Sequence, residues 1–344
     1  MKKLIAVMLL IALIFTMSGC GSGKEQGEKS ESIGKIIEES QTTRTVVDQA
    51  GRRVEVPKES ESFALCYRVI VRFLLNLEQG EKIKGIGKTE PFLVEVEPSL
   101  AEAVDVGKGV VDIEALAKLE PDIFFHKASD RETLEAVQKL GIPAIGINVE
   151  TPEDMLVAIE LMGNVCGAQE KAETLISYYR GKIAKAKELT QDIKNKKTAV
   201  VMGSSLGKVA TDRMLQGEML AAAGAINGAQ GISTGELWPT VGTEEIFQWD
   251  PEYIFIGNNE SANYTVEDIL TDANWSELTA VKNKNVYLLP AEADPWDFPG
   301  VVSGIGIDYM IHILYPELLS RQSLEENVTE FYQIAYGITA PKGW

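Results

Sequence analysis

EALAKLEPDIFF, residues 114–125, returns later in the chain as EEIFQWDPEYIF, residues 244–255. In each copy a glutamate opens a segment of helical apolar spacing, a proline follows seven positions later, and an apolar run comes next. The copies are 130 positions apart, measured from Pro121 to Pro251. This spacing is longer than the roughly 20–50 residues of a solenoid unit and is typical of one domain. The duplication therefore predicts two related lobes.

Candidate strands and helices alternate in both halves of the chain. Alternation of this kind predicts an α/β fold, here two similar lobes with central, mostly parallel sheets flanked by helices. Residues 43–57 alternate apolar and polar side chains around an Ala-Gly turn and predict an opening hairpin. The other predicted strands are residues 63–65, 83–86, 123–125, 144–147, 199–202, 253–256 and 286–289.

A long helical pattern lies between the two halves. Apolar residues recur with a period close to 3.6 over residues 169–193, and no proline interrupts them. About 25 helical residues would span roughly 37 Å, enough to join two lobes. We therefore predict an N-terminal lobe over residues 43–167, a rigid connecting helix over 168–195 and a C-terminal lobe over 196–344. A surface helix that belongs to one lobe is the alternative.

The first residues predict where the protein works. Residues 1–19 have a basic start and an apolar run, which is the layout of a signal peptide. The residues before Cys20 resemble a bacterial lipobox, in which the cysteine receives the lipid. Residues 20–42 begin with a Gly-, Ser-, Lys- and Glu-rich stretch and predict a flexible tether. We expect an extracytoplasmic body that is lipid-anchored to a bacterial cell membrane; an ordinary signal peptide is the alternative.

Composition excludes several classes of function. A formal net charge of −18 opposes binding to nucleic acid. The chain contains no Cys-x-x-Cys or Walker motif. Ser204 and Ser205 lie in a loop after a predicted strand, but no histidine lies near them in the sequence to activate either, so the chain is not expected to be an enzyme. A tetrapyrrole-processing enzyme and a surface scaffold are the weaker alternatives. Cys66 and Cys166 could form a disulfide or be two buried free thiols, and the sequence leaves both open.

Several stretches, in this order and spacing, carry a family resemblance. Together with the lipobox, the tether and the connecting helix, the chain resembles the helical-backbone class of ABC-importer substrate-binding lipoproteins, the iron-siderophore, haem and cobalamin group. The resemblance covers nearly everything after residue 43. The supporting stretches are VVDQAGRRVEVP (46–57), VQKLGIPAIGI (137–147), EMLAAAGAINGAQ (218–230), LWPTVGTEEIFQWDPEYIFIG (237–257) and VKNKNVYLLP (281–290).

The resemblance also implies partners. It implies an ABC permease and its ATPase in the membrane, and it implies that Glu114 and Glu244 dock onto arginines of that permease. Exposed carboxylates on two lobes would form steered, salt-sensitive contacts. The alternative is that both glutamates only stabilise helix N-termini through the helix dipole. The protein is expected to be a monomer.

Ligand-binding candidates follow the predicted strands. In open α/β sheets ligands bind beyond the carboxyl ends of the strands. Basic and aromatic residues at those positions favour an anionic ligand held against an apolar wall. Asn258 and Asn259 are weaker candidates at the same kind of position. The main candidates are Tyr67, Arg68, Lys88, Lys108, His126 and Lys127 in the first lobe, and Arg213, Trp238, Trp296 and Asp297 in the second.

The ligand class is constrained by the scarcity of histidine. The chain has only His126 and His312, whereas a bare Zn²⁺ or Mn²⁺ site needs several His and carboxylate ligands. No residue is expected to bind a metal directly, except that His126 could touch a chelated metal, and no cofactor is expected. A ferric siderophore is the favoured ligand, with haem next. A corrinoid or a small oxyanion such as molybdate is the alternative.

Overall fold

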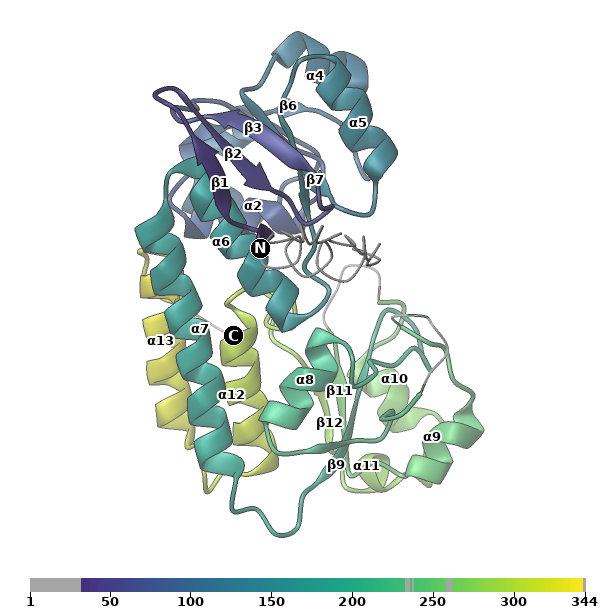
Figure 1. Cartoon of the computed structure of the whole chain (residues 1–344). Coiled ribbons are helices and arrows are strands. Elements are labelled where there is room, and N and C mark those ends of the chain that lie inside the picture. Colours follow the sequence, from purple (N-terminus) through teal and green to yellow (C-terminus); the bar gives the residue numbers. More distant parts are fainter. Residues whose placement is uncertain (1–31, 233–235, 237, 258–261, 343–344) are drawn as a thin grey trace, which may run out of the picture.

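The computed structural model describes residues 32–232, 236, 238–257 and 262–342. The predicted signal peptide, Cys20, and Asn258 and Asn259 lie outside the described residues. Two lobes lie one above the other in Figure 1, each with its own sheet. None of the helices in the described ranges is both long and apolar enough to cross a membrane.

The N-terminal lobe contains a five-stranded parallel sheet with the strand order β6-β5-β4-β7-β8. A three-stranded antiparallel sheet, β1-β2-β3, packs beside it. The helices of this lobe are α2 (Val69–Asn76), α3 (Pro91–Val96), α4 (Ile113–Leu119), α5 (Arg131–Lys139) and α6 (Pro152–Cys166). The strands are β1 (Ile36–Glu39), β2 (Thr43–Val47), β3 (Arg53–Pro57), β4 (Phe63–Leu65), β5 (Ile83–Ile86), β6 (Val104–Asp105), β7 (Ile123–Lys127) and β8 (Ala144–Ile147).

The C-terminal lobe contains a four-stranded parallel sheet with the order β10-β9-β11-β12. Both main sheets are parallel and covered by helices, so the predicted fold class is confirmed. The strands are β9 (Thr198–Met202), β10 (Ile226–Asn227), β11 (Tyr253–Ile256) and β12 (Val286–Leu288). The helices are α8 (Leu215–Ala222), α9 (Thr243–Trp249), α10 (Val266–Thr271), α11 (Thr279–Lys282), α12 (Ser303–Leu314) and α13 (Arg321–Tyr336).

The repeated sequence forms the same local structure twice. Helices α4 and α9 each end at an acidic residue with a left-handed backbone, Glu120 (φ 47°) and Asp250 (φ 40°), and a proline follows. The next acidic residue then holds the start of the adjacent strand: Asp122 accepts from the N–H of Ser62 at 2.9 Å, and Glu252 accepts from the N–H of Thr198 at 3.2 Å. The duplicated phrase is therefore a helix-to-strand connection that fixes the start of an interior strand in each sheet.

Two helices run past both lobes. Helix α7 (Gln169–Thr190) packs on α6 in the first lobe and on α8 and α12 in the second, and it ends five residues before the predicted boundary. Helix α13 returns from the second lobe to pack on α2 in the first, where Asn76 donates a hydrogen bond to the Ala335 carbonyl at 3.2 Å. Figure 1 shows α7 and α13 along the same side of the molecule. The C-terminal residues thus brace the N-terminal lobe, which the predicted lobe boundary missed.

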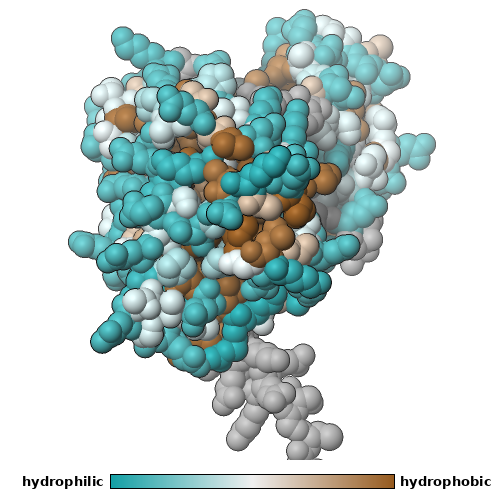
Figure 2. Space-filling view, turned by 90° about the horizontal axis from the view of Figure 1, so that it is seen from above, coloured by the Kyte–Doolittle hydropathy of each residue, from teal (hydrophilic) through white to brown (hydrophobic). Residues whose placement is uncertain are grey.

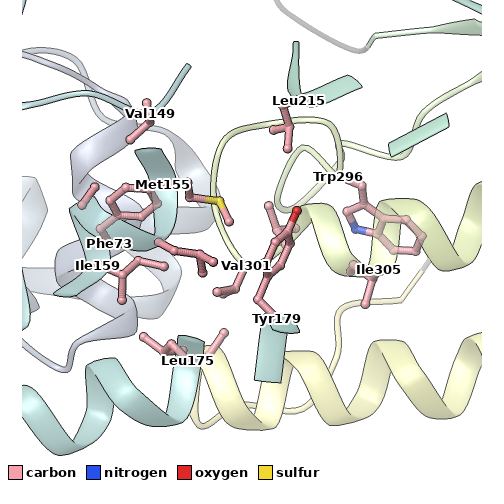
Figure 3. Close-up of a cluster of buried hydrophobic side chains, with 14 of the residues drawn as sticks. Phe73, Val149, Met155, Ile159, Leu175, Tyr179, Leu215, Trp296, Val301 and Ile305 are labelled. Carbon is pink, nitrogen blue, oxygen red and sulfur yellow. The ribbon is translucent and has the colours of Figure 1, made fainter. Parts of the chain in front are cut away.

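The two lobes share one continuous hydrophobic core. Phe73, Ile159 and Leu175 belong to the same buried cluster as Trp296 and Ile305 of the second lobe, as Figure 3 shows. Unlike this core, the outer surface is mostly hydrophilic. Seen from above, hydrophilic side chains cover most of the face, and apolar residues gather near its middle (Figure 2). A shared core limits how far the lobes can move apart without exposing apolar surface.

Two expectations about the first half need correction or completion. The predicted tether extends too far, because residues 36–39 form strand β1, which pairs with β2. Asn164 of α6 also donates a hydrogen bond to the Gly34 carbonyl at 2.8 Å, so the polar composition that suggests a tether ends before this point. Cys66 and Cys166 are both buried free thiols, which decides between the two alternatives for this pair.

Candidate functional site

A cavity of about 300 Å³ lies between the lobes. The first lobe contributes the segment that follows β8, and the second contributes the segment after β9, the start of α8 and the loop before α12. These are carboxyl ends of parallel strands, the usual place for a ligand in α/β folds. The lining residues are Val149, Glu150, Gly203, Ser204, Lys208, Met214, Leu215, Gln216, Trp238, Asp297, Phe298 and Pro299.

Packing holds the polar and aromatic groups of the second lobe in place. A Cβ on Gly203 would lie 2.9 Å from the Trp238 ring, so glycine is needed for the indole to lie against this backbone. A Cβ on Gly257 would lie 2.7 Å from a carboxylate oxygen of Asp297. The side-chain amide of Gln216 donates to the Asp297 carbonyl at 2.8 Å. One wall of the cavity therefore presents a fixed indole, a fixed carboxylate and a fixed amide.

The same lobe also supplies groups that can bind an anion. Lys208 lines the cavity and makes no ion pair with a carboxylate of the described residues. Helix α8 begins at the cavity, and its N-cap residue, Met214, provides no side-chain hydrogen bond. The first N–H groups of such a helix are available to an anionic partner and carry the positive end of the helix dipole. Lys208 and the start of α8 together suit an oxyanion or a carboxylate-rich ligand.

The first lobe contributes an aromatic and a charged side chain, Tyr67 and Lys127, near the cavity. Burial, together with the nearby Glu150 carboxylate, raises the pKa of Tyr67 to about 12. This phenol is thus a hydrogen-bond donor throughout the physiological pH range. The ammonium of Lys127 lies 5.1 Å from the centre of the Tyr67 ring, a cation–π arrangement. Tyr67 follows β4 and Lys127 ends β7, so neighbouring strands bring them together.

A buried ionic network lies behind the cavity. The Arg72 guanidinium on α2 contacts Glu90 and, from the second lobe, Asp294, each at 2.5 Å. The Tyr336 hydroxyl of α13 donates to the other oxygen of Asp294 at 2.5 Å. The Arg68 guanidinium lies 3.3 Å from Glu90. The network joins helix α2 to the loop that holds Asp294 and to helix α13, and so fixes the first lobe against the second.

One ring connects this network to the cavity. Phe298 lines the cavity, and the guanidinium carbons of Arg68 and Arg72 lie 5.6 and 5.3 Å from its centre. Both cations are within cation–π range of this ring and help to hold it in place. A ligand that touches Phe298 would contact a residue whose position depends on the interlobe ion pairs.

Comparison with known proteins identifies the family of this chain. The family described as Periplasmic binding protein matches residues 75–293. The chain belongs to the periplasmic binding protein family. A solved periplasmic solute binding protein from Veillonella parvula is 26% identical, with a TM-score of 0.75 over 87% of this chain and 94% of that one.

Some of the similar proteins are named for their ligands. The molybdate-binding protein MolA of Haemophilus influenzae is 23% identical over 85% of this chain and 91% of its own length. Its molybdate-bound structure superposes with a TM-score of 0.76 over 87% of this chain and 99% of that chain, at 21% identity. The iron(3+)-hydroxamate-binding protein YxeB of Bacillus subtilis is 22% identical over 83% of this chain and 89% of its own length. The periplasmic binding protein fold here thus resembles that of substrate-binding proteins for ABC transporters.

The structure separates the predicted site residues into three groups. Trp238 and Asp297 line the cavity. Arg68 lies beside it, because its guanidinium carbon is 5.6 Å from the centre of the lining ring of Phe298. Tyr67 is close enough to the lining residue Glu150 for that carboxylate to raise the pKa of the phenol, and Lys127 lies next to the Tyr67 ring. Lys88, Lys108 and Arg213 are exposed and are not among the lining residues.

Two further predicted ligand contacts have side chains that are buried in the protein. Trp296 is 1% exposed and packs edge-on against Tyr309 of α12, with ring centres 5.9 Å apart. His126 is 2% exposed, stacks on Phe124 and hydrogen-bonds to Asp130 at 2.8 Å. His126 lies within β7, where the alternation along the strand sets the direction of its side chain, whereas the direction of Trp296 is set by the loop after β12.

His126 predicts a pH effect on stability. Burial outweighs the hydrogen bond to Asp130 and lowers the pKa of His126 below its ordinary value. Folding thus keeps the imidazole neutral, while the unfolded chain takes up a proton below a pH of about 6.5. The stability that His126 contributes is present above that pH and is lost as the pH falls through it. Acidification from pH 7 to pH 5 should lower the urea midpoint of the wild type more than that of His126→Gln; parallel curves would contradict this.

Among the charged, amide and aromatic side chains that line the cavity, sequence reasoning missed Glu150, Lys208, Gln216 and Phe298. Lys208 follows β9 by six residues and reaches the cavity because the chain turns back, with the Gly203 N–H donating to the Lys208 carbonyl at 2.8 Å. Only a predicted tight turn in GSSLGK could have indicated it. Phe298 is the neighbour of the predicted Asp297, so the stretch was identified and only the contact residue was missed.

Proposed function

We propose that this protein is the lipid-anchored, extracytoplasmic receptor of an ABC importer, and that its cargo is a compact, metal-centred anion rich in oxygen. Two cargo classes share this chemistry: an oxyanion such as molybdate, and a small ferric chelate of the siderophore type. The observation that carries the proposal is the interlobe cavity, which Lys208 and the start of α8 supply with positive charge and N–H donors.

The size of the cavity supports a compact cargo. About 300 Å³ is at the lower end of the range of small-molecule pockets. Haem or a corrinoid would need much more of the interlobe space than this cavity supplies. The aromatic groups Tyr67, Trp238 and Phe298 provide apolar walls that a chelate could use and that an oxyanion does not need. These walls support the ferric chelate arm of the proposal, whereas Lys208 supports both arms.

Delivery is the second part of the proposal. Glu114 and Glu244 are exposed in the first turns of α4 and α9, at the ends of the two lobes that are remote from α7 in Figure 1. We propose that each docks onto a basic group of the permease. The dipole alternative is compatible with this role, because a carboxylate in a first helical turn is stabilising whether or not it also binds a partner.

A direct test is equilibrium dialysis of the purified soluble body, residues 32–344, against molybdate, tungstate, ferric citrate and a ferric trihydroxamate, with bound metal measured by mass spectrometry. Saturable one-to-one binding of either class, with the ligand recovered chemically unchanged, is the expected result. Binding of molybdate and tungstate alone selects the oxyanion arm, and binding of ferric chelates alone selects the other. Failure of all four to bind would overturn the proposed cargo class.

Lys208→Met should weaken binding of the cargo about 5- to 150-fold, because a charge-assisted hydrogen bond contributes about 1–3 kcal/mol. The matched control is Lys194→Met. Lys194 is exposed and precedes β9, so it lies toward the opposite edge of the same sheet. Dissociation constants from the dialysis experiment decide the question. Equal affinities for the two variants would remove Lys208 from the site.

A further inference from the structure

Exposed apolar side chains gather at the two predicted docking ends. Eight large apolar side chains are exposed in the part of the chain that the structure describes. Four of them flank the repeated glutamates: Val110 and Ile113 lie close to Glu114, while Leu206 and Phe247 lie close to Glu244. Carboxylates that only stabilised helix N-termini through the dipole would not need such neighbours. The distribution indicates that the ends of the lobes contact another protein through apolar surface as well as charge.

The two ends differ in shape. Beside Glu244 there is a groove of about 580 Å³ between the start of α9, the turn after Leu206 and the segment before α11. Trp275 is 4% exposed and lies in the groove, whereas Phe247 is 36% exposed. Apolar side chains thus line a groove that has Glu244 and Asp272 among its residues. The exposed apolar residue beside Glu114 is instead a projecting one, Val110, which is 81% exposed.

The two glutamates also differ in their charge environment. Glu114 forms an exposed ion pair with Lys118 at 2.8 Å, one turn along the same helix. Glu244 has no basic side chain within ion-pair distance among the residues that the structure describes. Its neighbour Glu245 and the groove residue Asp272 add further negative charge. The groove end is therefore acidic, with no basic side chain paired to Glu244 among the described residues, and a basic partner is complementary to it.

We propose that docking to the permease is asymmetric, with the groove beside Glu244 receiving a large apolar side chain that lies next to a basic side chain on the extracytoplasmic surface of the permease. This inference rests on the proposed function and specifies its partner. The acidic rim steers the basic group, an effect that salt screens. The apolar side chain fills the groove against Phe247 and Trp275, and this part of the binding energy does not depend on salt. The Glu114 end makes the weaker contact.

The test measures binding of the full-length protein to its cognate permease in nanodiscs, at about 50 and 500 mM salt. The variants are Phe247→Ser and Leu206→Ser in the groove, Val110→Ser at the other end, and Glu244→Gln. The matched control is Ile226→Ser, because Ile226 and Leu206 are both 38% exposed in the same lobe but only Leu206 lies in the groove. Thermal unfolding and cargo binding confirm that each variant is folded.

The groove variants should weaken binding at least ~5-fold at both salt concentrations, as expected for a buried apolar anchor. Glu244→Gln should weaken it mainly at low salt, Val110→Ser less than Phe247→Ser, and Ile226→Ser not at all. If only Glu244→Gln weakens binding, the groove inference is overturned and the proposed function stands. Equal losses for Val110→Ser and Phe247→Ser would overturn the asymmetry. A wild-type protein that binds cargo but not the permease would overturn both the inference and the importer assignment.

Discussion

Replacing Asp294 with alanine should lower the free energy of unfolding by about 3–5 kcal/mol, the usual cost of removing one partner from a buried ion pair. Asp294 is 1% exposed and contacts both Arg72 and Tyr336. Its loss would leave the guanidinium of Arg72 with Glu90 as its carboxylate partner and the Tyr336 hydroxyl without its acceptor. Urea denaturation, followed by circular dichroism, measures the change.

The matched control is Glu188→Ala. Glu188 forms an ion pair of similar chemistry with Lys185 at 3.0 Å, but both side chains are mostly exposed. Such a pair contributes less than about 1 kcal/mol, because water and salt screen it. The difference between the two variants isolates the effect of burial. If Asp294→Ala costs no more than Glu188→Ala, the network does not hold the lobes together.

Trp296→Ala should also cost about 3–5 kcal/mol of unfolding free energy, because it opens a large cavity in the shared core. The indole is 1% exposed and packs beside Ile305, as Figure 3 shows. A Cβ on Gly306 would lie 2.3 Å from the Trp296 carbonyl, so α12 and this loop are in close backbone contact. The surroundings can therefore collapse only slightly around the missing ring.

Trp238→Phe is the comparison variant for this prediction. Trp238 is partly exposed and lines the cavity, so the substitution should leave the unfolding free energy within about 1 kcal/mol of the wild type. It should also remove most of the change in tryptophan fluorescence that cargo binding produces. Trp296→Phe should preserve that change. The reverse pattern would place Trp296, rather than Trp238, next to the ligand.

The strongest local patterns were the most informative about the fold. The repeated glutamate and proline positions predict two helix-to-strand units. In both units the residue before the proline is acidic and has a left-handed backbone conformation. The 3.6-residue period over residues 169–193 predicts a long helix, and α7 covers most of it. These features depend on neighbours within one turn or one connection, which is the range over which sequence patterns act. Strand β1 was missed because its pairing with β2 contributes nothing to local composition.

The site was only partly predictable for the same reason. The rule that ligands lie beyond strand ends identifies Trp238 and Asp297, but it cannot distinguish them from Trp296 and His126. Whether a side chain after a strand points to the cavity or to the core is set by the loop that follows. Arg68 and Lys127 show the same limit, because their contacts with Glu90 and Tyr67 join residues far apart in the chain.

The amino-acid sequence by itself determined the duplicated α/β plan, the long helix between the halves and the class of protein, because each depends on periodicity or on motifs in a set order. Only the tertiary structure decided that α13 returns to the first lobe, that Arg72 and Asp294 join the lobes, and that Lys208 reaches the cavity. Contacts of this kind form between residues up to 259 positions apart. Their geometry depends on how packed elements meet in space, and no local pattern of side chains encodes it.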